Sequence, residues 1–459
     1  MLRRVVPFVV VALCALPVRA AGPQMKFEKY RLPNGLKVIL TEDHRLPQVS
    51  VNVSYHVGAA NQTPGRSGFA HLFEHMMFTP TQHAKDPDAV LESIGASGVN
   101  GLTSYDRTNY LETVPANELP TALWLESERM AFLLPTLDAK KLRIQRNVVS
   151  NEWRERYENS PYGLAVLRIC DLLYPTPHPY YHCVIGNLDE IQEATLDDVR
   201  DFFRRYYGPN NASLALVGDF DPAVARSLIE KYFGDVPRGP DVPKPKIPQP
   251  MLTKVVRERI EDKVARLPRL DVVWNGLRRY SDDEAPIDVL MAVLAVGRTS
   301  RLYRSMILDR EVASSVDASN YAWRLGGWIQ ITATALPGHS NEEMRTLIQA
   351  AIDDVKRNGV TADEVERAKM KIIVGKMRSL EGCAARADLM NDYEMMLGDP
   401  GYMPQDMARY RGVTPQSVQE VARRLLPDGK RIELEIEPAE AGRRYEASRR
   451  VPTPKQDDE

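Results

Sequence analysis

Two histidines and one glutamate stand within five consecutive residues, His71-Leu72-Phe73-Glu74-His75. In an α-helix, residues i and i+4 lie one turn apart on the same face, so His71 and His75 can bind one cation together. Glu74 is close enough to hold and deprotonate a metal-bound water without being a ligand. This spacing is the inverted form of the His-Glu-x-x-His pattern of zinc peptidases. It predicts one Zn²⁺ per chain; the alternative is two surface histidines on an amphipathic helix.

A catalytic zinc usually takes three protein ligands and keeps a fourth position for water. Spacing alone does not identify the third ligand. One candidate is Glu152, which lies in a helical pattern that begins at Asp138 and repeats apolar residues at Leu142, Ile144 and Val148. A carboxylate on that helix could face the metal.

The N-terminal residues predict export. Arg3 and Arg4 precede an apolar run that ends near Pro17, and small or branched residues lead up to Ala20, which is typical of a secretory signal peptide over residues 1–20. The run is too short to span a bilayer permanently. We therefore expect a periplasmic protein with no stable membrane anchor.

The composition is that of an ordinary globular protein, with 43% hydrophobic residues. Lys and Arg number 60 and Asp and Glu number 62, so there is no excess positive charge to neutralise a phosphate backbone. Nucleic acid is therefore not expected as a partner.

The elements that must position the site fall into two halves. A chain of 459 residues exceeds one ordinary hydrophobic core, and the Pro-rich segment 237–250 is stiff and extended. We predict an N-terminal zinc-binding domain at 24–236, a linker at 237–250, a homologous C-terminal domain at 251–445 and a disordered tail at 446–459.

A weak repeat supports the division. Leu46-Pro47 leads into a strand through Tyr55, and Leu267-Pro268 leads into a strand through Trp274, so each half is expected to open with a strand. Further patterns predict helices at 116–132, 285–296 and 361–378, and a buried strand at 212–217. The predicted fold class is α+β, with two duplicated α/β-sandwich domains.

Three cysteines remain after export: Cys170, Cys183 and Cys383. An odd number permits at most one internal disulfide. We favour separate buried thiols over a disulfide between Cys170 and Cys183.

Several stretches resemble the pitrilysin/insulinase family of zinc peptidases. In that family the third zinc ligand is a Glu in a segment of the kind Arg-x-Val-Val-x-x-Glu, about 76 residues beyond the zinc motif. Here Arg146-Asn147-Val148-Val149-Ser150-Asn151-Glu152 fits, with 76 residues between His75 and Glu152. The resemblance therefore implies that Glu152 is the third ligand, with Glu74 as general base of a metalloendopeptidase.

The resemblance extends to the segment from Asn100 to Tyr110. In the family this segment is an edge strand to which an extended or unfolded peptide adds as an extra strand, which implies substrate binding by Asn100, Gly101 and Thr103. Gly101 stands where the family prefers Ala. The alternative is that Asn100-Gly101 is a hairpin turn.

Two departures from the family pattern concern the chemistry. Gln145 replaces a second Glu two turns before Glu152, and its loss would alter the charge around the zinc without removing a ligand. Ser314 replaces a Tyr that, together with an Arg, holds the substrate carbonyl in active members. This chain therefore lacks that pair.

Members of this length form half of a clamshell, so a closed chamber needs a second chain. The resemblance implies a heterodimer in which this chain bears the zinc and a homologous partner without zinc carries the Arg/Tyr pair; a homodimer is the alternative. The family also contains inactive members that act as structural or chaperone-like subunits. The complete ligand set argues against that function here.

Overall fold

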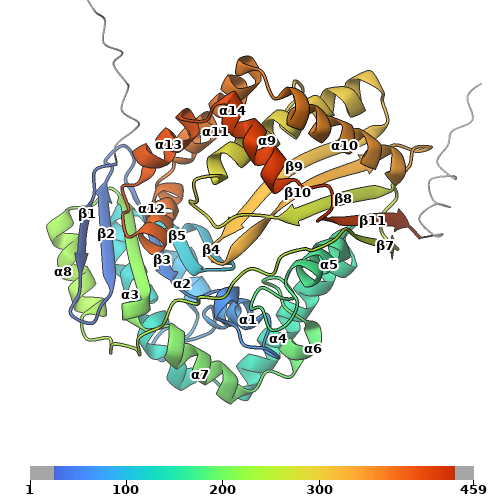
Figure 1. Ribbon diagram of the computed structural model, residues 1–459. Helices are drawn as coiled ribbons and strands as arrows, with labels where there is room; N and C mark the ends of the chain where they lie inside the picture. Colours follow the sequence, from blue (N-terminus) through green and yellow to red (C-terminus); the bar gives the residue numbers. More distant parts are fainter. Residues whose placement is uncertain (1–24, 440–459) are drawn as a thin grey trace, which may run out of the picture.

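The computed structural model describes residues 25–439, which form two β-sheets with helices packed on them (Figure 1). The predicted signal peptide and the whole of the predicted tail lie outside these residues. Helices and mixed sheets occur in both halves of the sequence, so the predicted α+β class is confirmed. Within residues 25–439, no helix is both long enough and apolar enough to cross a bilayer.

The first sheet contains six strands in the order β1-β2-β6-β3-β5-β4. Their bounds are β1 Glu28–Arg31, β2 Lys37–Glu42, β6 Ala212–Gly218, β3 Gln48–Tyr55, β5 Thr108–Pro115 and β4 Ser97–Thr103. Only the β2–β6 pair is parallel. β4 stands at one end of the order, so one of its edges has no strand beside it among the described residues.

The second sheet contains five strands in the order β7-β11-β8-β10-β9. Their bounds are β7 Val256–Asp262, β11 Ile432–Pro438, β8 Arg269–Asn275, β10 Gly326–Ala335 and β9 Ala313–Trp323. β7 and β11 are parallel and the other pairs are antiparallel. The order and directions match β2-β6-β3-β5-β4, which confirms the duplication. Each half opens with a strand, as expected, but the opening strands are β1 and β7; the strands predicted through Tyr55 and Trp274 are β3 and β8, which follow them.

Helices cover both sheets. In the first half they are η1 Ala59–Asn61, α1 Phe69–Met76, α2 Pro87–Ser93, η2 Ala116–Glu118, α3 Leu119–Phe132, η3 Leu134–Thr136, α4 Ala139–Trp153, the π-helical turn η4 Arg154–Glu158, α5 Gly163–Leu173, α6 Leu188–Gln192, α7 Leu196–Tyr206, η5 Pro209–Asn211 and α8 Pro222–Phe233. In the second half they are α9 Glu284–Ala295, the π-helical turn η6 Tyr303–Asp309, α10 Asn341–Asn358, α11 Ala362–Ser379, α12 Cys383–Leu397, α13 Met403–Arg411 and α14 Pro415–Leu425.

The two halves exchange one helix each. α5 from the first half packs on β11 of the second sheet, and α12 from the second half packs on β6 and β3 of the first sheet (Figure 1). The apolar side chains of Ala387 and Met390 lie against Val217 there. Asn391 adds a hydrogen bond of 2.9 Å to the backbone oxygen of Asn52. Each sheet therefore depends on the other half for part of its cover.

The Pro-rich segment 237–250 contains no helix or strand, as expected where proline removes backbone donors. Asn210 donates to the Pro240 carbonyl at its start, and Asn275 donates to the Pro250 carbonyl at its end. The segment thus contacts both sheet units. The domain boundaries drawn at this segment stay a prediction.

Cys170 and Cys183 form a disulfide, so the prediction of separate thiols is wrong. The chain turns back after α5 and brings the two Cα atoms to 5.5 Å, within bridging range. Sequence spacing does not reveal this return of the chain. Cys383, on α12, forms no disulfide within residues 25–439 and is partly buried.

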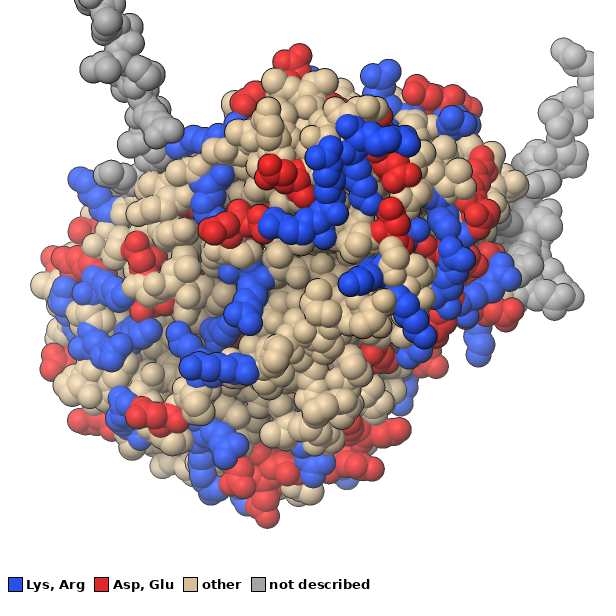
Figure 2. Space-filling model, viewed as in Figure 1, with Lys and Arg blue, Asp and Glu red and all other residues tan. Residues whose placement is uncertain are grey.

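Charged side chains of both signs are interspersed over the face drawn in Figure 2. This distribution agrees with a formal net charge of -2 that arises from nearly equal numbers of basic and acidic residues.

Candidate metal centre

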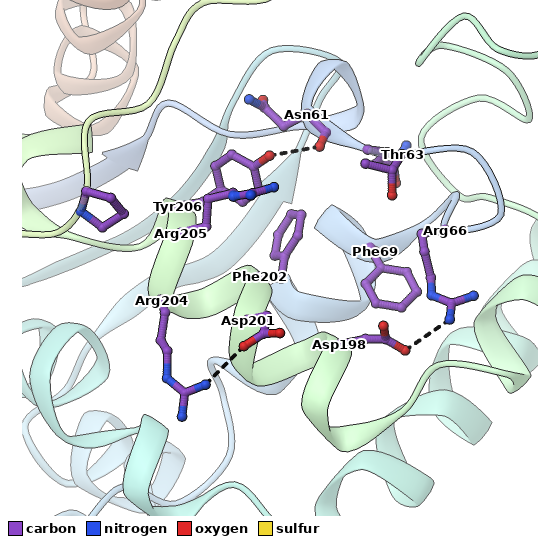
Figure 3. Close-up of a pocket in the computed structure, with 12 residues that line it drawn as sticks. Asn61, Thr63, Arg66, Phe69, Asp198, Asp201, Phe202, Arg204, Arg205 and Tyr206 are labelled. Atoms are coloured by element: carbon purple, nitrogen blue, oxygen red, sulfur yellow. Dashed lines mark hydrogen bonds and ion pairs between the residues drawn. The ribbon is translucent and has the colours of Figure 1, made fainter.

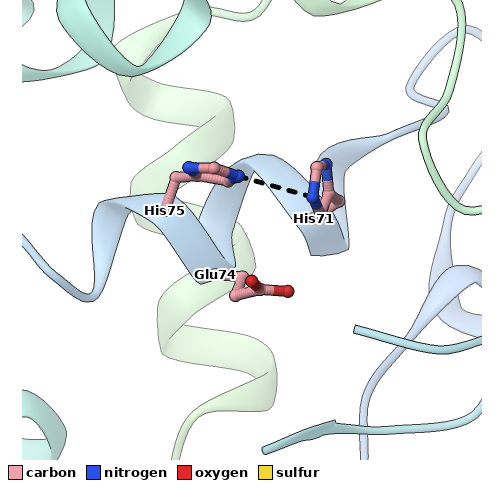
Figure 4. A group of neighbouring side chains, drawn as sticks. All are labelled: His71, Glu74 and His75. Carbon is pink, nitrogen blue, oxygen red and sulfur yellow. Dashed lines mark hydrogen bonds between the residues drawn. The ribbon is translucent and has the colours of Figure 1, made fainter. Parts of the chain in front are cut away.

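The helix α1 carries the histidine pair and is largely buried. It begins after Gly68, which has φ +78°, and a Cβ there would lie 2.6 Å from the Ile185 carbonyl oxygen. Only glycine combines this left-handed backbone with so close an approach. The side chains of His71, Glu74 and His75 project from neighbouring turns of α1 (Figure 4).

Two ring nitrogens and one carboxylate oxygen converge beside this helix. His71 Nε2 and His75 Nε2 are 3.4 Å apart, and Glu152 Oε2 lies 3.6 Å from the first and 3.1 Å from the second. Ligands placed about 2.0–2.1 Å from a tetrahedral zinc are separated by roughly 3.3 Å. The three donor atoms therefore have the spacing of a zinc ligand set, and their chemistry suits zinc.

Glu74 also belongs to the cluster, because one donor atom from each of His71, Glu74 and His75 lies within 4.8 Å of the others. Its Oε2 accepts a hydrogen bond of 2.5 Å from the Thr103 hydroxyl. No side-chain hydrogen bond from the described residues engages Oε1. Glu74 is thus held at one oxygen and free at the other, which suits a base better than a ligand.

Burial governs the protonation of the site. It lowers the pKa of His71 to about 4, so this imidazole is neutral and able to bind a metal at neutral pH. Burial also raises the pKa of Glu74, against the opposing effect of the Thr103 hydrogen bond. Burial raises the pKa of Glu152 as well, but the hydrogen bond from His75 and the nearby positive charges outweigh it and lower that pKa overall.

The predicted substrate segment lies on the edge strand β4. The alternative of a hairpin turn at Asn100-Gly101 is wrong, because the strand continues to Thr103 and the turn follows at Ser104–Arg107. Asn100, Gly101 and Thr103 line a cavity of about 360 Å³ together with the metal-site residues. Thr103 contacts the proposed base directly, whereas its contact with substrate stays a prediction.

Gly101 packs tightly against Glu74. A Cβ at this position would lie 2.8 Å from Glu74 Cγ and 2.8 Å from Phe78 Cε2. Alanine, the residue that the family prefers here, would force one of these side chains to move. The glycine therefore fits the position that Glu74 occupies in this chain.

The helix α4 positions Glu152 and continues into the π-helical turn η4. Ile144 and Val148, which the apolar pattern used, are exposed; Leu142 and Val149 are the buried apolar residues of α4. The helix prediction holds, but its buried face is rotated from the one the pattern suggested. The face with the exposed pair has no cover among the described residues.

Sequence reasoning missed Arg156. Arg156 Nη1 lies 3.0 Å from Glu152 Oε1. Arg156 and Tyr157 both line the cavity beside the metal site. The i,i+4 spacing from Glu152 was the available signal. π-Helical turns are frequent at functional sites, and this one brings consecutive residues to the same cavity.

The two departures from the family pattern lie in different places. Gln145 lines a neighbouring cavity of about 480 Å³ that also includes Glu74 and His75. Ser314 lies in β9 of the second sheet, where its hydroxyl donates to the Thr334 carbonyl at 3.2 Å. Ser314 does not line the cavity around the metal site.

Two family models match the chain. The model described as Insulinase (Peptidase family M16) matches residues 37–168, and the model described as Peptidase M16 inactive domain matches residues 193–372. The first match contains every residue of the candidate metal centre.

Curated relatives are named zinc proteases. The chain is 28% identical to zinc protease PqqE of Helicobacter pylori over 376 residues, which cover 80% of this chain and 83% of that protein. It is 23% identical to the uncharacterized zinc protease YmxG of Bacillus subtilis over 412 residues, which cover 89% of this chain and 97% of that protein.

Solved structures share the fold. A protease from Helicobacter pylori has a TM-score of 0.84 at 24% identity, with 91% of this chain and 100% of that chain covered. The periplasmic protease PqqL from Escherichia coli has a TM-score of 0.75 at 20% identity, with 95% of this chain and 50% of that chain covered. This fold therefore corresponds to the whole of the Helicobacter pylori chain and to about half of the PqqL chain, in agreement with the half-clamshell prediction.

Proposed function

This chain belongs to the insulinase family of peptidases, family M16, and we propose that it is a zinc metalloendopeptidase that cleaves extended or unfolded peptides. The observation that carries the proposal is the convergence of His71 Nε2, His75 Nε2 and Glu152 Oε2 at zinc-ligand spacing. A carboxylate with one free oxygen, Glu74, lies beside them. We assign one Zn²⁺ to the chain.

His71, His75 and Glu152 would hold the zinc. When bound, the metal supplies Lewis-acid polarisation of the scissile carbonyl and makes a bound water more acidic. Glu74 accepts the proton of the attacking water at its free oxygen and passes it to the leaving amine. The Thr103 hydroxyl holds the other Glu74 oxygen and so fixes the direction of the free one.

The raised pKa of Glu74 suits this function. A general base works best when its pKa lies near the working pH, because it can then both accept and return a proton. Burial supplies the shift, and the Thr103 hydrogen bond limits it by stabilising the carboxylate.

The edge strand β4 favours an extended substrate. Its outer edge has unpaired backbone groups among the described residues, and a peptide can add to them as a further strand. Backbone hydrogen bonds between β4 and a peptide depend little on the amino-acid sequence of that peptide. Val99 and Leu102 on β4 are exposed, which offers apolar surface to a substrate that has lost its own fold.

We further propose that the chain pairs with a second M16 subunit and acts in the periplasm. One observation supports pairing: a similar fold fills only half of the PqqL chain. A heterodimer follows if a zinc-free partner supplies the Arg/Tyr pair that this chain lacks, and a homodimer is the alternative. PqqL is named a periplasmic protease, and the predicted signal peptide agrees with the same location.

The test compares the wild type with Glu74→Gln, using an unfolded peptide with an internal fluorescence quencher. The variant should retain one zinc per chain and lose cleavage by roughly a thousandfold. The assay is run with and without a co-expressed partner and a chelator. Unchanged cleavage by Glu74→Gln would show that another group is the base.

An inactive structural subunit is the second candidate. The name of the model that matches residues 193–372, Peptidase M16 inactive domain, favours it, although those residues exclude the metal centre. A purified wild type that holds no zinc and cleaves nothing, alone or with its partner, would establish this alternative.

A further inference from the structure

The turn between β4 and β5 is held by the second half of the chain. It comprises residues 104–107 and directly follows Thr103, the residue that donates to Glu74. In the second half, the corresponding turn joins β9 to β10 and consists of Arg324 and Leu325. The two turns are bonded to a common pair of side chains where the halves meet (Figure 1). The strand that carries Thr103 therefore ends against the other half of the fold.

Asp106 makes this contact, and it is only 4% exposed. One of its carboxylate oxygens accepts a hydrogen bond of 2.7 Å from the backbone N–H of Arg324. The other oxygen accepts a hydrogen bond of 3.0 Å from the Tyr180 hydroxyl. The Tyr180 oxygen in turn accepts a bond of 3.2 Å from the backbone N–H of Leu325. Both oxygens of this buried carboxyl group are thus satisfied by groups outside the β4–β5 hairpin.

The neighbours of Asp106 also contact the second half. The ring of Tyr105 lies 4.2 Å from the ring of Trp323, at the end of β9. Arg107 pairs with Asp388 of α12 at 2.8 Å. Asp106 differs from both neighbours because it bonds a backbone group of the matching turn, which fixes that turn itself. Three consecutive residues of the first half therefore bind the second half.

The same turn leads directly to the proposed base. Thr103 is the last residue of β4 and pairs with Thr108, the first residue of β5. Their hydroxyl oxygens are 3.3 Å apart, and the Thr103 hydroxyl donates to Glu74 at 2.5 Å. A shift of the turn therefore moves Thr103 relative to Glu74.

We propose that Asp106 is a positioning residue of the peptidase: it ties the β4–β5 turn to the second half and so fixes the Thr103 hydroxyl that directs Glu74. The second half then assists catalysis without supplying a side chain to the cavity around the metal site. Asp106 itself lines neither of the two cavities beside that site. The inference rests on the proposed function, because it concerns the same base.

A double-mutant cycle between Asp106→Ala and Thr103→Val tests the proposal, with the zinc-loaded full chain and the quenched peptide. Each single variant should lower kcat by about tenfold, because a small misplacement of a catalytic group is costly. If Asp106 acts through Thr103, the double variant should lie within about threefold of Thr103→Val. Losses that multiply to about a hundredfold would overturn the proposal, as would wild-type kcat in either single variant.

Two milder variants decide the matter if Asp106→Ala fails to fold. Tyr180→Phe removes one hydroxyl and leaves the Arg324 bond, so kcat should fall about threefold, and not further when combined with Thr103→Val. Asp106→Asn keeps an oxygen for the Arg324 N–H and offers an N–H to the Tyr180 oxygen, so it should retain kcat within about threefold. Wild-type kcat in Tyr180→Phe, or a tenfold loss in Asp106→Asn, would contradict the assigned contacts.

Two controls separate this effect from a general loss of stability. Glu258→Ala removes an ion pair of 2.8 Å with Arg168, a contact between the halves that β7 and α5 make. Asp201→Ala is the same chemical change as Asp106→Ala but removes a pair of 3.0 Å with Arg204, at a cavity of about 520 Å³ lined by α1 and α7 (Figure 3). Both controls should keep wild-type kcat. A tenfold loss in Glu258→Ala would mean that any weakening of the junction lowers activity, and the specific assignment to Asp106 would be wrong.

Hydrogen exchange distinguishes a failure of this inference from a failure of the peptidase function. In Asp106→Ala the backbone amides of β4 and β5 should exchange at least about tenfold faster, while those of β3 and those of both controls stay as in the wild type. Unchanged exchange in β4 and β5 overturns the inference even if the wild type cleaves peptides. A wild type that cleaves nothing contradicts the peptidase function, and exchange then still decides whether Asp106 fixes the turn.

Discussion

The two sheets place a carboxylate at the same junction, between a helix and the edge strand, but surround it differently. In the first half, Thr103 of β4 donates to Glu74 of α1 at 2.5 Å. In the second half, Asn320 of β9 donates to Asp288 of α9 at 2.8 Å. Tyr410 donates to the second oxygen of Asp288 at 2.7 Å, so both of its oxygens are engaged.

The difference separates the features of the site that both halves share from those that only the first half has and that hydrolysis requires. Both carboxyl groups have pKa values raised mainly by burial. Only Glu74 has a free oxygen, and only α1 has a histidine one residue after its carboxylate and another three residues before it. Both halves of the duplicated fold therefore hold a buried carboxylate. Hydrolysis also needs the two histidines of α1 and a carboxylate oxygen that no side chain engages.

Removal of one histidine should give the largest difference between the two halves. His75→Ala should lose zinc and reduce kcat/KM by roughly a thousandfold or more, because only two ligands remain. Asp288→Asn alters the corresponding place in the second half and should keep both zinc and activity. Metal analysis and peptide cleavage measure the two effects, and zinc retained at full stoichiometry in His75→Ala would contradict the ligand assignment.

Gly101→Ala displaces the base without touching a ligand. The new Cβ would approach Glu74 Cγ at 2.8 Å, so we expect kcat/KM to fall by about 10- to 100-fold with zinc retained. Ser97→Ala, on the same strand but away from the cavities, serves as the control. Wild-type activity in Gly101→Ala would mean that Glu74 shifts at no cost.

Arg156→Gln removes the partner of Glu152 Oε1. Loss of a group that orients a ligand typically weakens metal binding by about 10- to 100-fold, and we expect the lower end because Arg156 is largely exposed. Competition with a chelator measures the zinc affinity directly. Arg154→Gln, whose side chain bonds Asn151 instead, should bind zinc as wild type; equal losses in both variants would indicate a general charge effect.

The sequence predicted the site well where a local rule applied. The i,i+4 rule was sufficient for His71 and His75, and apolar periodicity predicted α4, although not its buried face. Glu152 was chosen by family resemblance, since no local rule connects two residues that have 76 residues between them. Such a pair meets only through packing of α1 on α4.

Long-range contacts were beyond the sequence for the same reason. The Cys170–Cys183 disulfide depends on a return of the chain after α5. The exchange of α5 and α12 between the halves leaves no periodic signal, because each helix shows only that it has an apolar face. The repeat predicted that the two halves share a fold, but not the order of the strands within either sheet.

The smallest effect concerns stability and belongs to Asp288. Burial raises its pKa to about 6 from an ordinary 3.8; Glu284 adds to the rise, while the bonds from Tyr410 and Asn320 and the charge of Lys376 oppose it. The folded state thus binds this proton more tightly than the unfolded state. Its stabilising contribution is complete below about pH 4 and is lost as the pH rises through about 6.

Asp288→Asn removes this titration, because the amide is neutral at every pH. The amide also keeps the size of the carboxyl group, so a difference in stability between variant and wild type reports the charge alone. A shift of this size corresponds to about 3 kcal/mol at most, so the variant should gain up to that amount relative to wild type between about pH 4 and pH 7. Urea unfolding at several pH values measures the difference. Parallel stability curves for the two proteins would mean that Asp288 is ionised in the fold at neutral pH without cost, and that the capping by Tyr410 and Asn320 compensates fully for its burial.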